Sequence, residues 1–137
     1  ITRYFLAEEK KRRIRVLIAS NDIHVQKVAL QTLQKIGYGA DVVPHGNEVL
    51  ATLAKGSYDL VLMDIDLPQV DGMAAAAAIR RKEKQTGEHI PLVGMTSQAA
   101  GKDRQRCMEA GMDDYILKPL QAIDLADVLD RFLSEAD

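Results

Sequence analysis

Five short apolar runs rich in β-branched residues recur along the chain, and segments with helical spacing separate them. Most of these runs are continuous rather than alternating, as expected for strands that are covered on both faces in a parallel sheet. We predict strands at residues 14–19, 40–43, 60–63, 91–95 and 115–117.

The segments between these runs carry apolar residues at the spacing of amphipathic helices. Glycines, which commonly end helices, follow two of them. We predict helices that end at Gly37 and Gly56, a helix that begins at Gly72, a helix at 98–110 and a last helix that buries apolar residues of 125–132. This regular alternation predicts an α/β fold, a doubly wound parallel sheet with five helices.

The composition is that of one soluble domain. The chain has 137 residues, of which 47% are hydrophobic, and a net charge of −2. So small a charge gives no general attraction to nucleic acid or to an anionic membrane, and no apolar run approaches the roughly 20 residues that span a bilayer. A single cysteine, Cys107, excludes an internal disulfide and fits the cytoplasm. We interpret the charged stretch 1–13 as a linker or a remnant of a preceding domain, and 14–137 as the domain.

Polar side chains follow the predicted strands at their carboxyl ends, where open α/β sheets bind ligands. Asp64 follows the third run, Thr96 and Ser97 follow the fourth, and Lys118 follows the fifth. An aspartate, a hydroxyl and an ammonium at one edge suit phosphoryl transfer to a carboxylate. Asp64 would be the nucleophile, Lys118 would neutralise a phosphoryl oxygen, and Thr96 would donate a hydrogen bond to another. We expect Lys118 to be an exposed lysine on this rim.

A divalent ion would offset the remaining negative charge of the phosphoryl group, and magnesium takes oxygen ligands. The candidate ligands are the Asp64 carboxylate, the backbone carbonyl of Asp66 and side-chain oxygens near Asn21 and Asp22. The sequence therefore predicts a magnesium site beside Asp64.

Three stretches carry these rim residues: Tyr58-Asp-Leu-Val-Leu-Met-Asp64-Ile-Asp-Leu-Pro68, Pro91-Leu-Val-Gly-Met-Thr96-Ser97, and Cys107 through Tyr115 to Lys118-Pro119. They resemble the response-regulator receiver domains of two-component signalling, and the last is most like receivers attached to hybrid sensor histidine kinases. The resemblance covers roughly residues 14 to 133. It implies a flavodoxin-like five-stranded sheet with strand order 2-1-3-4-5.

The resemblance also implies a role for each residue of the site. Asp64 would accept a phosphoryl group from a phosphohistidine of a histidine kinase or a histidine phosphotransfer domain. Thr96, Ser97 and Lys118 would bind the phosphoryl group and act in the switch, Tyr115 would be the switch aromatic, and Lys118–Pro119 would be a cis peptide. The domain would be a phosphoacceptor rather than an enzyme, either as a stand-alone receiver or as part of a hybrid histidine kinase, and a homodimer is a further expectation.

One departure from the family pattern concerns the metal. Receivers normally place two acidic residues after the first strand, where this chain has Ser20 and Asn21. Asn21 would be a weak ligand, Ser20 is the least favoured candidate, and Asp22, displaced by one position, is a further one. Because ligand charge tunes the affinity for divalent ions, we expect weak magnesium binding.

Two other functions stay open. Ser20 and Asn21 also fit a pseudo-receiver, an interaction module that signals without phosphorylation. Asp64 and Asp66, with Thr96 and Lys118, also fit a haloacid-dehalogenase-like phosphatase. In that family, however, the nucleophile ends the first strand of the core, and this chain leaves little room for a cap domain.

Overall fold

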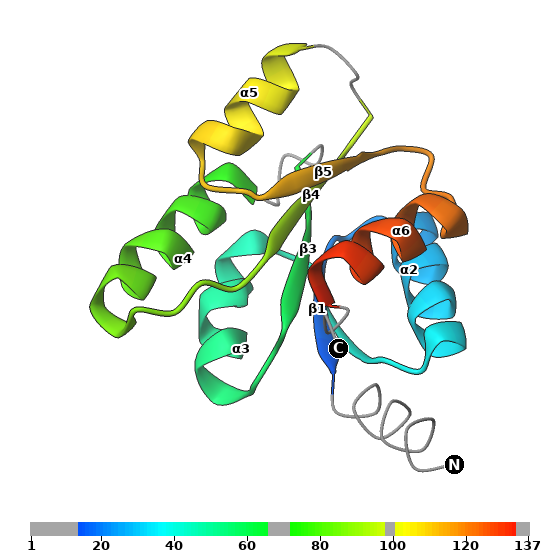
Figure 1. Cartoon of the computed structure of the whole chain (residues 1–137), viewed down its shortest axis with the longest axis horizontal. Coiled ribbons are helices and arrows are strands. Elements are labelled where there is room, and N and C mark those ends of the chain that lie inside the picture. Colours follow the sequence, from blue (N-terminus) through cyan, green and yellow to red (C-terminus); the bar gives the residue numbers. More distant parts are fainter. Residues whose placement is uncertain (1–13, 66–71, 98–100, 134–137) are drawn as a thin grey trace.

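The computed structural model describes residues 14–65, 72–97 and 101–133, and these residues form one five-stranded parallel sheet. The strand order is β2-β1-β3-β4-β5, so the predicted order 2-1-3-4-5 is confirmed (Figure 1). The strands are β1 (Arg15–Ala19), β2 (Gly39–Val43), β3 (Leu60–Asp64), β4 (Leu92–Thr96) and β5 (Asp114–Leu117).

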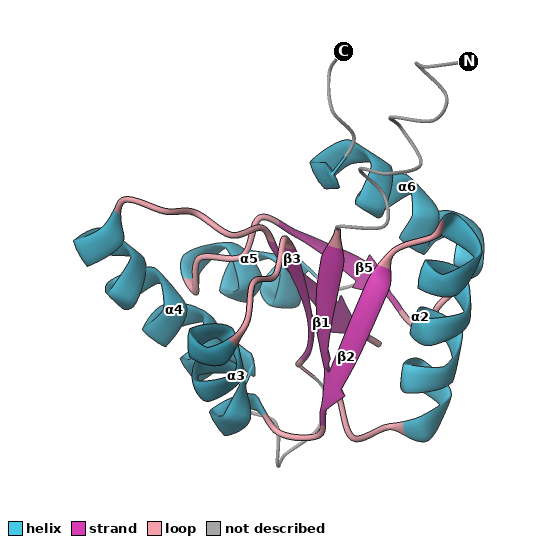
Figure 2. Ribbon diagram, turned by 90° about the horizontal axis from the view of Figure 1, so that it is seen from below, coloured by secondary structure: helices cyan, strands magenta, loops and turns pink. Residues whose placement is uncertain are grey.

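Helices cover both faces of the sheet, as Figure 2 shows. Helices α2 and α6 lie on one face, and α3, α4 and α5 lie on the other. The predicted five helices are therefore present in the described residues, together with a short 3-10 turn. Their bounds are α2 (Ile23–Ile36), η1 (Gly46–Glu48), α3 (Val49–Lys55), α4 (Gly72–Thr86), α5 (Gly101–Glu109) and α6 (Ala122–Leu133).

The observed elements differ from the predicted ones mainly at their ends. Strands β3 and β4 each run one residue further than predicted, so Asp64 and Thr96 are the last residues of their strands rather than the first residues after them. Helix α5 spans Gly101–Glu109, so it ends one residue before the predicted end at 110, and the predicted residues 98–100 lie outside the described part of the chain.

Two apolar cores explain the continuous apolar runs. Val16 and Ile18 of β1 point toward α2 and α6, whereas Leu17 and Ala19 point toward the other helices, and all four are fully buried. A strand that packs against an apolar core on each face of the sheet needs apolar residues at every position. Cys107 is also fully buried in the second core, which confirms its interpretation as a small hydrophobe.

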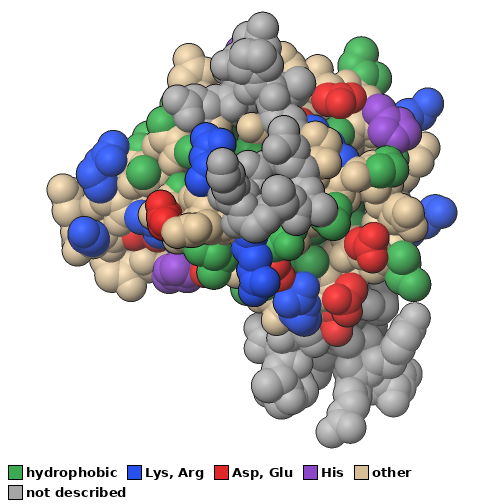
Figure 3. Space-filling model, turned by 90° about the horizontal axis from the view of Figure 1, so that it is seen from above, with side chains coloured by type: hydrophobic (Ala, Val, Ile, Leu, Met, Phe, Trp, Pro, Cys, Tyr) green, Lys and Arg blue, Asp and Glu red, His purple; other side chains and the backbone are tan. Residues whose placement is uncertain are grey.

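The surface carries charges of both signs. On the face in Figure 3, lysine and arginine side chains are interspersed with aspartate and glutamate side chains. Within the described residues, no helix has the length and apolar character needed to cross a membrane.

Candidate functional site

Asp64 lies at the carboxyl end of β3, in the interior of the sheet, and is 0% exposed. Strand β3 pairs with β1 on one side and β4 on the other, so the side chains that follow β1 and β4 end at the same edge. A buried carboxylate requires compensating partners, because removing it from water is costly.

The first partner of Asp64 is Lys118, which follows β5. Its Nζ donates to Asp64 Oδ1 at 2.9 Å, and its side chain is only 13% exposed. The expectation of an exposed lysine was therefore wrong, because the long side chain reaches inward to a buried charge. The Lys118 amide also donates to the Thr96 carbonyl at 2.7 Å, and the Lys118–Pro119 peptide is cis.

The second partner is Ser20, which follows β1 and is fully buried. Its Oγ donates to Asp64 Oδ2 at 2.7 Å. Both oxygens of the Asp64 carboxylate thus receive a hydrogen bond, one from an ammonium and one from a hydroxyl.

Thr96, Ser97 and Tyr115 lie in or directly after β4 and β5. Thr96 is fully buried at the end of β4, and Ser97 is the exposed residue after it. Tyr115 lies in β5 opposite Gly94 and packs, partly buried, against the second core. The topology therefore brings the ends of β4 and β5 together on one side of Asp64, with β4 next to its strand and β5 beyond β4.

The other predicted metal ligands lie in the loop after β1 and beyond β3. Asn21 is partly exposed. Asp22 caps helix α2, where its Oδ1 accepts from the amides of His24 at 2.9 Å and Val25 at 3.4 Å. Asp66 lies outside the described residues.

Comparison with known proteins now decides the family. The sequence matches the response regulator receiver domain over residues 16–130. The chain belongs to this family. It is 35% identical, over 119 residues, to a hybrid signal transduction histidine kinase of Dictyostelium discoideum, covering 80% of this chain and 6% of that protein. This receiver domain therefore spans a small part of the curated relatives it matches.

Two solved structures support the same assignment. The receiver domain of a sensor histidine kinase from Pseudomonas aeruginosa is 31% identical, with a TM-score of 0.78 over 89% of this chain and 98% of that one, and has magnesium coordinated in its active-site cleft. A second match, 25% identical with a TM-score of 0.81 over 92% of this chain and 96% of that one, comes from a Saccharomyces cerevisiae co-crystal of a histidine phosphotransfer protein and the receiver domain of its downstream response regulator. Together they place this chain among the receivers of two-component phosphorelays.

Magnesium is the ion that membership of this family implies, and the donors of this receiver domain fit it in kind. The Asp64 carboxylate and the Asn21 amide supply oxygen, which magnesium prefers. Among the described residues, however, no group of three histidine, cysteine, aspartate or glutamate side chains is placed to hold a metal.

From the sequence, Ser20 was predicted as a replaced carboxylate and the least favoured metal ligand, and its hydroxyl contact with Asp64 was missed. The position of Ser20 directly after the first apolar run is the one sequence signal that could have indicated this contact. The direction of a hydroxyl proton depends on the atoms that surround it in the folded protein, and the sequence alone does not give these neighbours.

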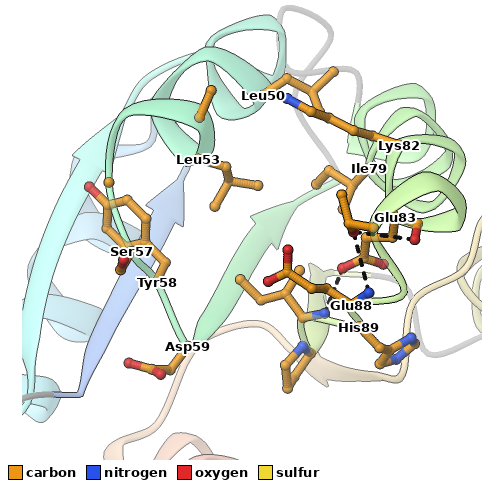
Figure 4. A pocket seen from close by; sticks show the side chains of 15 residues that line it. Leu50, Leu53, Ser57, Tyr58, Asp59, Ile79, Lys82, Glu83, Glu88 and His89 are labelled. Atoms are coloured by element: carbon orange, nitrogen blue, oxygen red, sulfur yellow. Dashed lines mark hydrogen bonds between the residues drawn. The ribbon is translucent and has the colours of Figure 1, made fainter.

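A cleft of about 510 Å³ lies at the opposite end of the sheet from Asp64. Leu53, Tyr58, Ile79 and Ile90 line it between α3 and α4, with Glu88 at its edge (Figure 4). The residues before β3 and β4 form its wall, whereas Asp64 ends β3. This cleft is therefore separate from the site of the receiver domain.

Proposed function

We propose that this receiver domain accepts a phosphoryl group on Asp64 from a phosphohistidine. An Asp64 oxygen attacks the phosphorus, the phosphorus–nitrogen bond breaks, and the imidazole leaves. The observation that carries the proposal is the buried Asp64 carboxylate held 2.9 Å from the Lys118 ammonium. During transfer, that ammonium neutralises the negative charge that develops on the phosphoryl group.

The neighbouring residues have supporting roles in this proposal. The Thr96 hydroxyl and Ser97 bind phosphoryl oxygens, and Tyr115 responds to the phosphorylated state. The domain acts as a phosphoacceptor rather than as an enzyme. A cytoplasmic location and a homodimer remain predictions.

The direct test is phosphorylation by acetyl phosphate with magnesium, followed by intact mass measurement. We expect one added phosphoryl group on the wild type and none on Asp64→Asn. Equal labelling of the two proteins contradicts the proposal. Absence of labelling in the wild type favours the pseudo-receiver function, and turnover of a generic phosphate ester favours a phosphatase.

Magnesium would be held by Asp64 and Asn21, with the Asp66 carbonyl and Asp22 as further candidates. When bound, the ion offsets the negative charge of the phosphoryl oxygens. We expect weak binding, because Ser20 and Asn21 are neutral. Asn21→Asp adds a carboxylate and should tighten magnesium binding by about tenfold, as a calorimetric titration would measure. Equal affinities contradict the weak-site hypothesis.

The proposed partner is a histidine kinase or a histidine phosphotransfer domain, with a hybrid histidine kinase as the parent protein. Two large apolar side chains near the site support a docking face. Ile23 at the start of α2 is 76% exposed, and Ile123 at the start of α6 is 75% exposed. Helices α2 and α6 pack against each other and both begin at the edge where Asp64 lies. Exposed apolar residues grouped beside a site indicate a protein contact.

A further inference from the structure

Ser20 differs from the other neighbours of Asp64 because it is an uncharged donor at a position where the family carries an acidic residue. Both side chains are 0% exposed, and Ser20 Oγ lies 2.7 Å from Asp64 Oδ2. A hydrogen bond to a buried carboxylate is among the stronger ones, because one partner is charged and water is excluded.

The surroundings of Ser20 fix the direction of this bond. Its amide donates to the Val43 carbonyl at 3.0 Å, and its carbonyl accepts from Gln26 Nε2. Its Oγ accepts from the Asp22 amide at 3.1 Å. Because that amide already supplies a proton to Oγ, the hydroxyl proton is directed at Asp64. The donor is held in place before any ligand arrives.

Ser20 and Lys118 together engage both Asp64 oxygens with donors that belong to the protein. A metal ion needs carboxylate lone pairs that point toward it. The Ser20 hydroxyl proton points at Oδ2, so an ion that approaches along the same lone pair has to displace it. Asp22 Oδ1 is likewise engaged, by the first amides of α2.

We propose that Ser20 is a positioning residue whose hydroxyl orients the Asp64 carboxylate and competes with magnesium for Oδ2. This inference rests on the proposed function in that it takes the Asp64 site to be the magnesium site. Ser20 then lowers magnesium affinity in two ways: it lacks the charge of the acidic residue, and it occupies a ligand atom. The second effect is specific to a hydroxyl and is absent from alanine.

The test is a calorimetric magnesium titration of the full chain as wild type, Ser20→Ala and Ser57→Ala. Ser57→Ala removes the same hydroxyl from an exposed position beside the distant cleft and serves as the matched control. We expect Ser20→Ala to bind magnesium at least about tenfold more tightly, the factor that corresponds to a hydrogen bond with one charged partner. Ser57→Ala should match the wild type.

Three outcomes overturn the proposal. Weaker binding by Ser20→Ala identifies Ser20 as a magnesium ligand, and unchanged binding shows that its hydroxyl does not compete. Absence of binding by the wild type and by Ser20→Ala shows that this site takes no magnesium. Far-UV circular dichroism checks folding. If Ser20→Ala does not fold, Ser20→Cys, a weaker donor of similar size, should bind more tightly than the wild type, and equal or weaker binding overturns the proposal.

These titrations need no phosphodonor. Failure of acetyl phosphate to label Asp64 therefore contradicts the proposed function and leaves the magnesium comparison valid.

Discussion

At the scale of single residues, the site combines a buried charge with a nearly buried counter-charge. Asp64 is 0% exposed and the Lys118 side chain 13% exposed. Removing one partner of such a pair leaves the other charge in a poorly solvated place, which costs more free energy than the intact pair contributes. Lys118 therefore matters for folding as well as for its proposed contact with the phosphoryl group.

We predict that Lys118→Ala lowers the free energy of unfolding by about 3 kcal/mol and also impairs phosphorylation of Asp64. Urea denaturation measures the first effect and acetyl phosphate labelling the second. Lys82→Ala, an exposed lysine on α4, is the control and should change stability by less than about 0.5 kcal/mol. If Lys118→Ala has the same urea midpoint as the wild type, the stabilising role of Lys118 is contradicted.

A second group of polar and charged residues links the start of β1 and the residue Tyr58 before β3 to the middle of the outer strand β2. The Tyr58 hydroxyl donates to Asp41 at 2.7 Å, and Arg15 forms an ion pair with the same carboxylate. The Tyr58 hydrogen bond and, next, the Arg15 hydrogen bond hold the pKa of Asp41 below its ordinary value. The hydrogen bond to Asp41 raises the pKa of Tyr58.

These shifts predict how stability depends on pH. A carboxyl group with a lowered pKa contributes stability above its unfolded pKa of about 3.9, and this is lost as the pH falls through its folded pKa. Tyr58 contributes stability below about pH 10, and this is lost as the pH rises through its raised pKa. As the pH falls from about 5 to about 2, Asp41→Asn should therefore lose less stability than the wild type. Urea midpoints of both proteins across this pH range measure the difference. Glu88→Gln controls for the loss of one exposed charge, and parallel acid profiles for the wild type and Asp41→Asn contradict the prediction.

At the scale of elements, the Arg80 side chain connects α4 to the starts of β4 and β5 through hydrogen bonds and an ion pair. Its Nε donates to the Gly111 carbonyl at 2.8 Å, one terminal nitrogen donates to the Ile90 carbonyl, and the other pairs with Asp113 at 2.8 Å. Asp113 also accepts from the Leu92 amide at 2.9 Å. These contacts fix the beginnings of β4 and β5. Thr96 is the last residue of β4, and Lys118 directly follows β5.

Gly111 fits under the Arg80 side chain in a left-handed conformation, with φ +101°, and a Cβ there would lie 2.6 Å from Arg80 Cγ. Gly87, after α4, is also left-handed, with φ +78°, but has open space around it. We predict that Gly87→Ala costs about 1 kcal/mol from backbone strain alone. Gly111→Ala should cost about 3 kcal/mol, because steric overlap adds to the strain. Urea denaturation compares them, and equal losses would show that the Arg80 contact is not rigid.

At the scale of the whole molecule, the two faces of the sheet differ in what they offer a partner. Helices α2 and α6 present Ile23 and Ile123 beside the edge where Asp64 lies. Helix α5, on the other face, presents Met108, which is 51% exposed. A donor that must bring its phosphohistidine to Asp64 can use the first pair directly.

We predict that Ile23→Asp combined with Ile123→Asp slows phosphoryl transfer from a histidine phosphotransfer protein by at least about tenfold, because buried apolar anchors dominate such interfaces. Labelling by acetyl phosphate should stay at the wild-type rate. The probe is the phosphorylated S. cerevisiae phosphotransfer protein, and Met108→Asp is the control. Equal slowing of both reactions would place the defect in the site rather than in docking.

The sequence by itself determined the class of the fold and the edge of the sheet where the proposed site lies. Buried strands need apolar residues at every position, and helix ends need caps such as Asp22 and Gly37, so both leave local patterns. The order of the strands followed from resemblance to a family, whereas Asp64, Thr96 and Lys118 were grouped because each follows a predicted strand at the same edge of the sheet.

The tertiary structure alone decided how Asp64 is held. Ser20 lies 44 residues before Asp64, and Lys118 lies 54 residues after it, so no local pattern links them. The inward reach of Lys118 and the direction of the Ser20 hydroxyl depend on burial and on which donors surround each oxygen. Those quantities exist only after the strands have assembled, because desolvation is what makes each hydrogen bond to the carboxylate necessary.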